Sequence, residues 1–186
     1  MRIIGGKFKG QKLEFLKNPA TRPLKDSVKE NIFNILEHSK KIKVKINESN
    51  VLDFYSGIGS FGLECLSRGA KRITFVEYDN SAVKILRLNL SKISSNNKAF
   101  VFNQKTQTAL NDFKTEKFDI FFLDPPFKNK EFLIDLKLIK KKKLFKKNHI
   151  VVLHREKKTA DELKNNLEIF EEKIYGRSKI IFGKFI

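Results

Sequence analysis

The chain has 186 residues, 40% of them hydrophobic, which excludes a disordered chain and suits one packed domain with a modest extension. A single cysteine excludes an internal disulfide, and without a signal-peptide core or a bilayer-length apolar run we expect a cytoplasmic protein with no membrane partner. The 39 Lys and Arg residues against 21 Asp and Glu residues give a net charge of +18, which favours a polyanionic partner.

Residues 1–48 predict a small basic extension, ahead of a main domain over 49–186. Basic and apolar side chains alternate around glycines over 2–15, a pattern typical of a short hairpin. A helix should follow, because Ser27 and Glu30 have capping-box spacing and apolar residues then recur at helical intervals. The extension holds 12 Lys and Arg against 5 Asp and Glu, and its candidate phosphate contacts are Arg2, Lys7, Lys9 and Arg22.

From residue 50, short apolar runs alternate with amphipathic segments, which predicts an α/β fold with a mostly parallel sheet. The expected strands cover residues 50–54, 72–77, 99–103, 118–123, 149–154, 168–175 and 179–185. The expected helices cover residues 60–68, 80–92, 106–113, 130–142 and 157–166. Only Gly176 and Arg177 separate the last two strands, so we expect these to form an antiparallel hairpin.

A glycine-rich turn follows the first of these strands. Gly57, Gly59 and Gly62 have the G-x-G-x-x-G spacing, which lets a backbone approach a ligand at a helix N-terminus. Asp53 ends that strand, where a carboxylate would repel a pyrophosphate and attract a cation, and Glu77 ends the next strand, where it can bind ribose hydroxyls. A ligand with a ribose and a cationic amino-acid tail but no phosphate is S-adenosylmethionine. Further candidates for this methyl-donor site are Phe54, Tyr55 and Tyr78.

Asp124, Pro125, Pro126 and Phe127 follow the apolar run 120–123 and form a second candidate site. The prolines lack an N–H and hold the preceding residue in extended geometry, so the strand should end in a stiff loop. Ligands of open α/β sheets bind outside the carboxyl ends of the strands. A planar, amine-bearing base could stack on Phe127 while Asp124 and the loop carbonyls accept its N–H bonds. The alternative is a strand-ending turn with a buried phenylalanine.

Together these residues resemble the RsmD family of bacterial 16S ribosomal RNA guanine-N2 methyltransferases. The motifs that carry the resemblance are Thr21-Arg22-Pro23, residues 26–36, residues 53–62, Ser67-Arg68-Gly69-Ala70, Glu77 and residues 124–127. The resemblance implies a Rossmann-like class I methyltransferase with a seven-stranded sheet and S-adenosylmethionine as methyl donor. It implies a guanine in small-subunit ribosomal RNA or in the assembled subunit as substrate, and the basic extension as the RNA-binding part. We further expect a monomer and no metal.

Two positions depart from the family pattern. Lys105, followed by Thr106, stands where the family commonly has Asp or Asn near the adenine, so that contact could pass to the backbone or to Asn103. Phe127 replaces the commoner tyrosine and keeps its stacking face. The chemistry would fall to Asp124 as acceptor for the guanine amino group, with the Pro125 carbonyl as a second acceptor.

Several alternatives remain open from the sequence. Adenine-N6 nucleic-acid methyltransferases share the Asp-Pro-Pro-aromatic loop, but they usually carry a sizeable target-recognition domain. A non-catalytic RNA-binding assembly factor could keep the same fold. A dehydrogenase is disfavoured because Asp53 opposes a pyrophosphate. Seven lysines over 137–147 could contact phosphates or form a solvated helix end.

Overall fold

The computed structural model describes residues 1–15, 24–93 and 97–186. The helices within these ranges are α1 (Asp26–His38), α2 (Ser60–Ser67), α3 (Asn80–Lys92), α4 (Thr106–Asp112) and α5 (Phe132–Lys142). The strands are β1 (Asn50–Phe54), β2 (Arg72–Val76), β3 (Ala99–Phe102), β4 (Phe118–Leu123), β5 (Phe145–Glu156), β6 (Leu167–Tyr175) and β7 (Ser178–Phe185).

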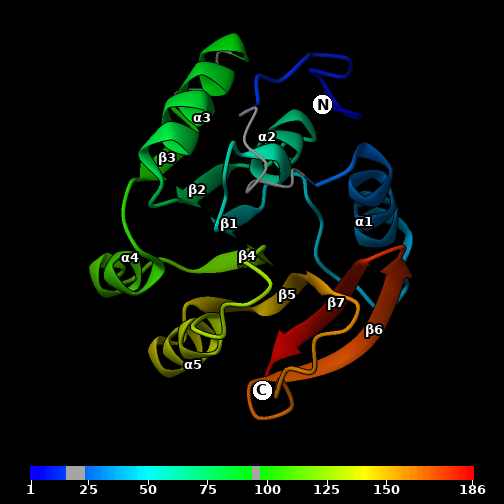
Figure 1. Ribbon diagram of the computed structural model, residues 1–186, viewed down its shortest axis with the longest axis vertical. Helices are drawn as coiled ribbons and strands as arrows, with labels where there is room; N and C mark the ends of the chain where they lie inside the picture. The colour runs from blue at the N-terminus through cyan, green and yellow to red at the C-terminus, as the bar shows by residue number, and fades with distance from the viewer. Residues whose placement is uncertain (16–23, 94–96) are drawn as a thin grey trace.

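The seven strands form one sheet in the order β3-β2-β1-β4-β5-β7-β6 (Figure 1). β1 to β5 are parallel, whereas β7 runs antiparallel to both β5 and β6. The expected terminal hairpin is confirmed, with Tyr175 paired to Ser178 and Gly176 in the turn at φ 60°. The α/β, Rossmann-like prediction with a mostly parallel seven-stranded sheet is therefore confirmed.

Each face of the sheet is covered by its own helices, as Figure 1 shows. Along β4, Ile120 and Phe122 belong to the apolar cluster that includes α1, α2 and α3, whereas Phe121 and Leu123 belong to the cluster of α4 and α5. The strand is apolar at every one of these positions because both of its faces are buried.

The N-terminal extension shares a core with the sheet. Ile3, Leu13 and Phe33 belong to the same buried cluster as Val51 of β1. The extension therefore packs continuously onto the α1–α3 side of the sheet, and the division at residue 48 stays a prediction about function.

A buried polar contact fixes the first residues to α2. The fully buried Lys29 of α1 donates to the Arg2 carbonyl at 2.7 Å and lies 3.8 Å from the Glu64 carboxylate. Glu64 in turn accepts the backbone N–H groups of Ile4 and Gly5 at 2.8 and 2.7 Å. Burial lowers the pKa of Lys29, and the neighbouring carboxylates oppose that shift. The N-terminal segment is thus held by charge-assisted bonds as well as by apolar packing.

The helix predicted over 157–166 is wrong, because this segment forms turns and irregular backbone ahead of β6. Thr159 closes a turn onto the Glu156 carbonyl through its N–H (3.0 Å) and its hydroxyl (2.8 Å). The Asp161 carboxylate lies 2.9 Å from Nε of the buried Arg155. A buried guanidinium requires an anionic partner, so this tertiary ion pair outweighs the helix propensity of the segment.

Two details of the extension also differ from prediction. The hairpin predicted over 2–15 is reduced to one antiparallel bridge between Arg2 and Lys12, with turns between them. α1 begins at Asp26, so Ser27 lies inside the first turn and the predicted capping box is wrong. A carboxylate in the first turn interacts favourably with the helix dipole, which suits a start at Asp26.

Candidate active site

Two motifs far apart in the chain meet at the carboxyl edge of the sheet. β1 and β4 are neighbours, with Phe54 opposite Leu123, and the next amide, that of Asp124, donates to the Phe54 carbonyl at 3.3 Å. The strand order changes direction between β1 and β4, which is where open α/β sheets bind ligands. The glycine turn and the proline loop therefore lie side by side at one edge.

Carboxylates organise the glycine turn after β1. The N–H of Gly57 donates to Oε2 of Glu77 at 2.9 Å, and the N–H of Gly62 donates to Oδ2 of Asp53 at 3.0 Å. Gly57 has φ 54°, and a Cβ there would have no atom of the described residues within 4 Å, so on this part of the chain the backbone is open to a ligand. A Cβ at Gly62 would lie 2.3 Å from the Phe75 ring, so that glycine instead permits close packing of α2 on β2.

Asp53 is an ionisable group in an unfavourable position. Its side chain is 1% exposed, and within the described residues its Oδ1 has no hydrogen-bond partner. Burial raises its pKa well above the ordinary value, and the nearby carboxylates of Asp124 and Glu77 raise it further. The buried hydroxyl of Ser56 in the same turn also has no partner among these residues. The arrangement suits a ligand that brings a cation and hydrogen-bonding groups.

Two of the predicted donor-site side chains point elsewhere. The Phe54 ring is fully buried in the cluster beneath α4 and α5, so only its backbone can face a ligand. The Tyr55 hydroxyl donates to Asp135 of α5 at 2.5 Å, and Asp135 also accepts from Gln107 at 2.7 Å. Burial raises the pKa of both Tyr55 and Asp135. Tyr55 therefore anchors the turn to α5, and sequence analysis missed its partner Asp135.

Gly59, also predicted for the donor site, is the N-cap of α2 with φ 84°, whereas the last three predicted donor-site residues lie around the ends of β2 and β3. Tyr78 is 62% exposed, Lys105 is exposed at the N-cap of α4, and Thr106 is buried in the first turn of that helix. The Asn103 amide donates to the carbonyls of Glu77 and Tyr78 at 3.2 and 3.3 Å. Asn103 thus joins the end of β3 to the segment after β2, and Tyr78 offers an accessible aromatic face.

The proline loop places Asp124 against a histidine that sequence analysis did not assign to the site. Oδ1 of Asp124 lies 2.8 Å from Nδ1 of His154 on β5. The Phe127 ring meets the His154 ring edge-on, with centroids 5.5 Å apart and an interplanar angle of 90°. Asp124 and Phe127 both stay partly exposed, so each can contact a ligand.

Arg155 holds the backbone of this loop and was also missed from the sequence. Its guanidinium donates to the carbonyls of Pro126 and Phe127 at 3.2 and 2.9 Å, with longer bonds to Pro125 (3.4 Å) and Asn129 (3.5 Å). The Pro125 carbonyl, predicted as a second acceptor for the base, therefore already has one weak partner. Two consecutive prolines have carbonyl acceptors but no N–H donors, so their carbonyls need donors from elsewhere in the chain. This need was the sequence signal for a buried side-chain donor such as Arg155.

The predicted RNA contacts spread along the length of α2. Arg2, Lys7 and Lys9 are all exposed, whereas Arg22 lies outside the described residues. The Arg2 carbonyl binds Lys29, whose Nζ also reaches Ser60 at the start of α2 (3.3 Å). The Lys7 N–H donates to the Ser67 carbonyl at the other end of α2 (2.7 Å), about 10 Å from Ser60 along the helix axis. Arg2 is therefore nearer the carboxyl edge than Lys7.

Part of the lysine-rich segment 137–147 has a structural role. Lys142 donates to the Asn111 and Phe113 carbonyls at the end of α4 (3.3 and 3.2 Å), and Lys146 pairs with Asp119 at 2.8 Å. These lysines join α5 and β5 to their neighbours. Figure 1 places α5 across the sheet from the N-terminal segment, so the two basic regions lie on different sides.

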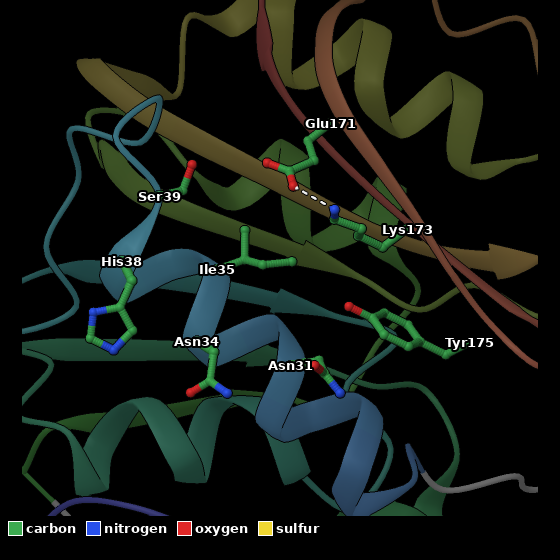
Figure 2. A pocket seen from close by; sticks show the side chains of 8 residues that line it. All are labelled: Asn31, Asn34, Ile35, His38, Ser39, Glu171, Lys173 and Tyr175. Carbon is green, nitrogen blue, oxygen red and sulfur yellow. Dashed lines mark ion pairs between the residues drawn. The ribbon is translucent and has the colours of Figure 1, made fainter.

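A groove of about 740 Å³ lies between α1 and β6, away from the residues above (Figure 2). Its walls are formed by Asn31, Asn34, Ile35, His38, Ser39, Glu171, Lys173 and Tyr175. Figure 2 shows its carboxylate, Glu171, paired with Lys173, at 3.2 Å. The strand edge is the better candidate for an active site despite the size of this groove, because among the described residues it holds a buried carboxylate oxygen without a partner, Oδ1 of Asp53, beside an open glycine backbone.

Among residues 1–15, 24–93 and 97–186, no group of three His, Cys, Asp or Glu side chains could hold a metal ion. The helices of the same ranges are too short or too polar to span a bilayer. His149, on the same strand as His154, accepts the Phe185 N–H at 2.9 Å among aromatic rings.

The chain is similar to known proteins over almost its whole length. The family model described as Conserved hypothetical protein 95 matches residues 1–184. Ribosomal RNA small subunit methyltransferase D of Haemophilus influenzae is 34% identical over 178 residues, which cover 95% of this chain and 89% of that protein. The protein of the same name from Buchnera aphidicola (subspecies Acyrthosiphon pisum) is 30% identical, with 92% and 86% covered. The solved structure "Putative methyltransferase yhhF from Escherichia coli" has a TM-score of 0.82 at 28% identity, with 100% and 97% covered.

Proposed function

The chain belongs to the family described as Conserved hypothetical protein 95, the RsmD family, and on that premise we propose that it is a ribosomal RNA methyltransferase. Its reaction would move a methyl group from S-adenosylmethionine to the exocyclic N2 of a guanine in small-subunit ribosomal RNA. The observation that carries the proposal is the meeting of Asp124 with the glycine turn at the carboxyl ends of β4 and β1.

The residues of the glycine turn fit the methyl donor. Oδ1 of Asp53, which has no partner in the described part of the chain, suits the ammonium of the donor's amino-acid tail, and the described residues leave the Gly57 backbone open to close approach. Each oxygen of the Glu77 carboxylate accepts one backbone N–H, from Gly57 (2.9 Å) and from Asp79 (2.8 Å), and each keeps a lone pair for a ribose hydroxyl. When bound, S-adenosylmethionine supplies an electrophilic methyl group on a sulfonium.

Asp124 would prepare the acceptor nitrogen. The lone pair of guanine N2 is delocalised into the ring, so the amino group is a poor nucleophile until it is oriented and polarised. A hydrogen bond to the Asp124 carboxylate favours a pyramidal nitrogen, and the same carboxylate or water can take the proton that the methylated nitrogen loses. Phe127 would stack on the base, and positioning of two bound reactants can contribute roughly 7–11 kcal/mol.

Labelled donor and small ribosomal subunits from a strain that lacks this gene test the proposal. We expect wild-type protein to form N2-methylguanine, located by nucleoside mapping, and Asp124→Asn to lose at least about 100-fold in rate with unchanged donor affinity by calorimetry. The matched control is Asp119→Asn, because Asp119 lies on the same strand and pairs with Lys146 instead. Naked RNA supplied in parallel distinguishes free RNA from the assembled subunit as substrate.

The same assay separates the alternatives. Label in N6-methyladenine would favour the adenine-N6 reaction, which shares the proline loop. Tight RNA binding without donor binding would favour an assembly factor on a methyltransferase fold. Normal turnover by Asp124→Asn would remove Asp124 from the chemistry.

A further inference from the structure

His154 holds the side of Asp124 that faces the sheet. It is almost fully buried on β5, with Nδ1 2.8 Å from Asp124 and Nε2 2.9 Å from the hydroxyl of Ser178 on β7. Its ring also meets Phe127 edge-on. One imidazole therefore contacts both side chains to which the proposed function gives the target base.

Hydrogen-bonding rules favour one arrangement of protons in this chain of three groups. An ionised Asp124 only accepts hydrogen bonds, so Nδ1 of His154 carries the proton and donates it. Nε2 of a neutral ring is then an acceptor, and the Ser178 hydroxyl can donate to it. Both ring nitrogens are paired, and the ring cannot turn without breaking both bonds.

We infer that His154 is a positioning residue, which fixes the Asp124 carboxylate with Oδ1 toward the sheet and Oδ2 toward the acceptor amine. This inference rests on the proposed function. A carboxylate attached to a loop can rotate about two side-chain bonds, and its two oxygens are equivalent unless a neighbour distinguishes them. The bond from Nδ1 removes that freedom before the base arrives, which is how a supporting shell preorganises a site. Ser178 acts through His154, because its hydroxyl donates to Nε2 and so keeps the proton on Nδ1.

The test compares His154→Phe with His154→Asn. Phenylalanine keeps a ring against Phe127 and removes the donor, whereas asparagine places an amide N–H near the position of Nδ1. We expect His154→Phe to lower kcat about 100-fold with an unchanged KM for the donor, and His154→Asn to recover most of that loss. His38→Phe, on the exposed end of α1, is the matched control and should keep the wild-type rate.

Folding is separated from positioning by two further measurements. Thermal unfolding of each variant shows whether the fold is intact, and Ser178→Ala gives a milder perturbation that should lower kcat several-fold. His154→Phe in an Asp124→Ala background should lower the residual single-turnover rate no further, because the two residues act as a unit. Nitrogen NMR should show the Nδ1–H tautomer for His154 in wild type and its loss in Asp124→Ala, without any RNA present.

The outcomes distinguish this inference from the proposed function. A wild-type kcat in folded His154→Phe, or an Nε2–H tautomer in wild type, would overturn the positioning role. Additive losses in the double variant would overturn it too, as would a folded His154→Asn that is as slow as His154→Phe. If wild-type protein methylates no RNA while His154 keeps the Nδ1–H tautomer, the proposed function fails and the contact itself stands.

Discussion

The two loops at the carboxyl edge of the sheet are held by side chains of opposite charge. The glycine turn after β1 presents backbone N–H groups, and the carboxylates of Asp53 and Glu77 accept them. The loop after β4 contains two prolines, so it presents carbonyls, and the Arg155 guanidinium donates to them. The difference follows from the backbone, because glycines at a helix N-terminus leave N–H groups unpaired and prolines have none.

This difference in charge also predicts what is lost when the side chains that hold each loop are removed. Asp53 and Glu77 hold the turn, and the proposed function gives them contacts to the methyl donor, so their loss should affect ligand binding. Arg155 is 1% exposed, pairs with the equally buried Asp161 and lies over the Phe132 ring at 4.5 Å. Its loss should affect the stability of the fold first and the reaction only through the position of the loop.

Arg155→Met tests the proline loop and should have the largest effect. The substitution leaves the Asp161 carboxylate and the loop carbonyls buried without their donor, so we expect the free energy of unfolding to fall by about 3–5 kcal/mol. Denaturant unfolding monitored by circular dichroism measures it. A fall of less than about 1 kcal/mol in the free energy of unfolding would contradict the role of Arg155 in holding the loop. Adding Asp161→Leu should restore part of the stability, since no buried charge then remains unpaired, while methylation stays impaired.

Asp53→Asn should separate ligand binding from stability at the glycine turn. Asparagine can still accept the Gly62 N–H but lacks the charge, so donor affinity should fall by about 1.5–3 kcal/mol in calorimetry while RNA affinity is kept. Glu77→Ala should lower donor affinity similarly. Unchanged donor affinity in both variants would contradict the proposal that Asp53 binds the amino-acid tail of the donor and that Glu77 binds its ribose.

The stability difference between Asp53→Asn and wild type should depend on pH. Burial raises the Asp53 pKa in the folded state, so the unfolded chain ionises first as the pH rises above about 4, and the fold loses stability until the folded pKa is passed. Asp53→Asn should therefore be more stable than wild type at neutral pH, and the advantage should vanish below about pH 4. Thermal unfolding across pH measures the difference, and an equal advantage at every pH would contradict the burial argument.

Gly62→Ala and Gly57→Ala should show that Gly62 serves the packing of the fold and that Gly57 serves the binding of the donor. A Cβ at Gly62 meets the Phe75 ring at 2.3 Å, so we expect a loss of about 1–3 kcal/mol in unfolding free energy. A Cβ at Gly57 meets no atom of the described residues within 4 Å, although its φ of 54° strains any L residue there, so Gly57→Ala should lower donor affinity more than Gly62→Ala does. Equal donor affinities in the two variants would contradict this division.

The smallest effects should come from the basic extension. We propose that Arg2 contacts RNA phosphates near the carboxyl edge, so Arg2→Gln should weaken RNA binding and reduce the slope of log affinity against log salt by roughly 0.7–0.9. The comparison is the double variant of Lys7→Gln and Lys9→Gln, in the part of the N-terminal segment where Lys7 contacts the C-terminal end of α2, and donor affinity should not change. If neither change alters the slope, the lysines of 137–147 become the better candidates.

Much of the site could be predicted because its signals are local in the sequence. The glycine spacing, the acids near the ends of β1 and β2, and Asp124 before two prolines each depend on a few neighbouring residues. The predicted helix over 157–166 failed for the opposite reason, since the ion pair of Arg155 with Asp161 is a tertiary contact that local propensity does not contain. His154 and Arg155 were missed because nothing near them in the sequence shows that β5 lies beside β4.

The sequence by itself determined the strand and helix periods of the core, the antiparallel ending and the two motifs proposed to carry the chemistry, because hydrophobic periodicity and backbone chemistry act over short distances. Only the tertiary structure decided that Asp124 and the glycine turn share one edge, that Phe54 and Tyr55 turn away from it, and that a buried arginine and histidine hold the proline loop. Those facts depend on which strands lie next to each other in the sheet. The strand order is decided by burying both apolar faces of the whole sheet under helices, which no single segment of the sequence determines.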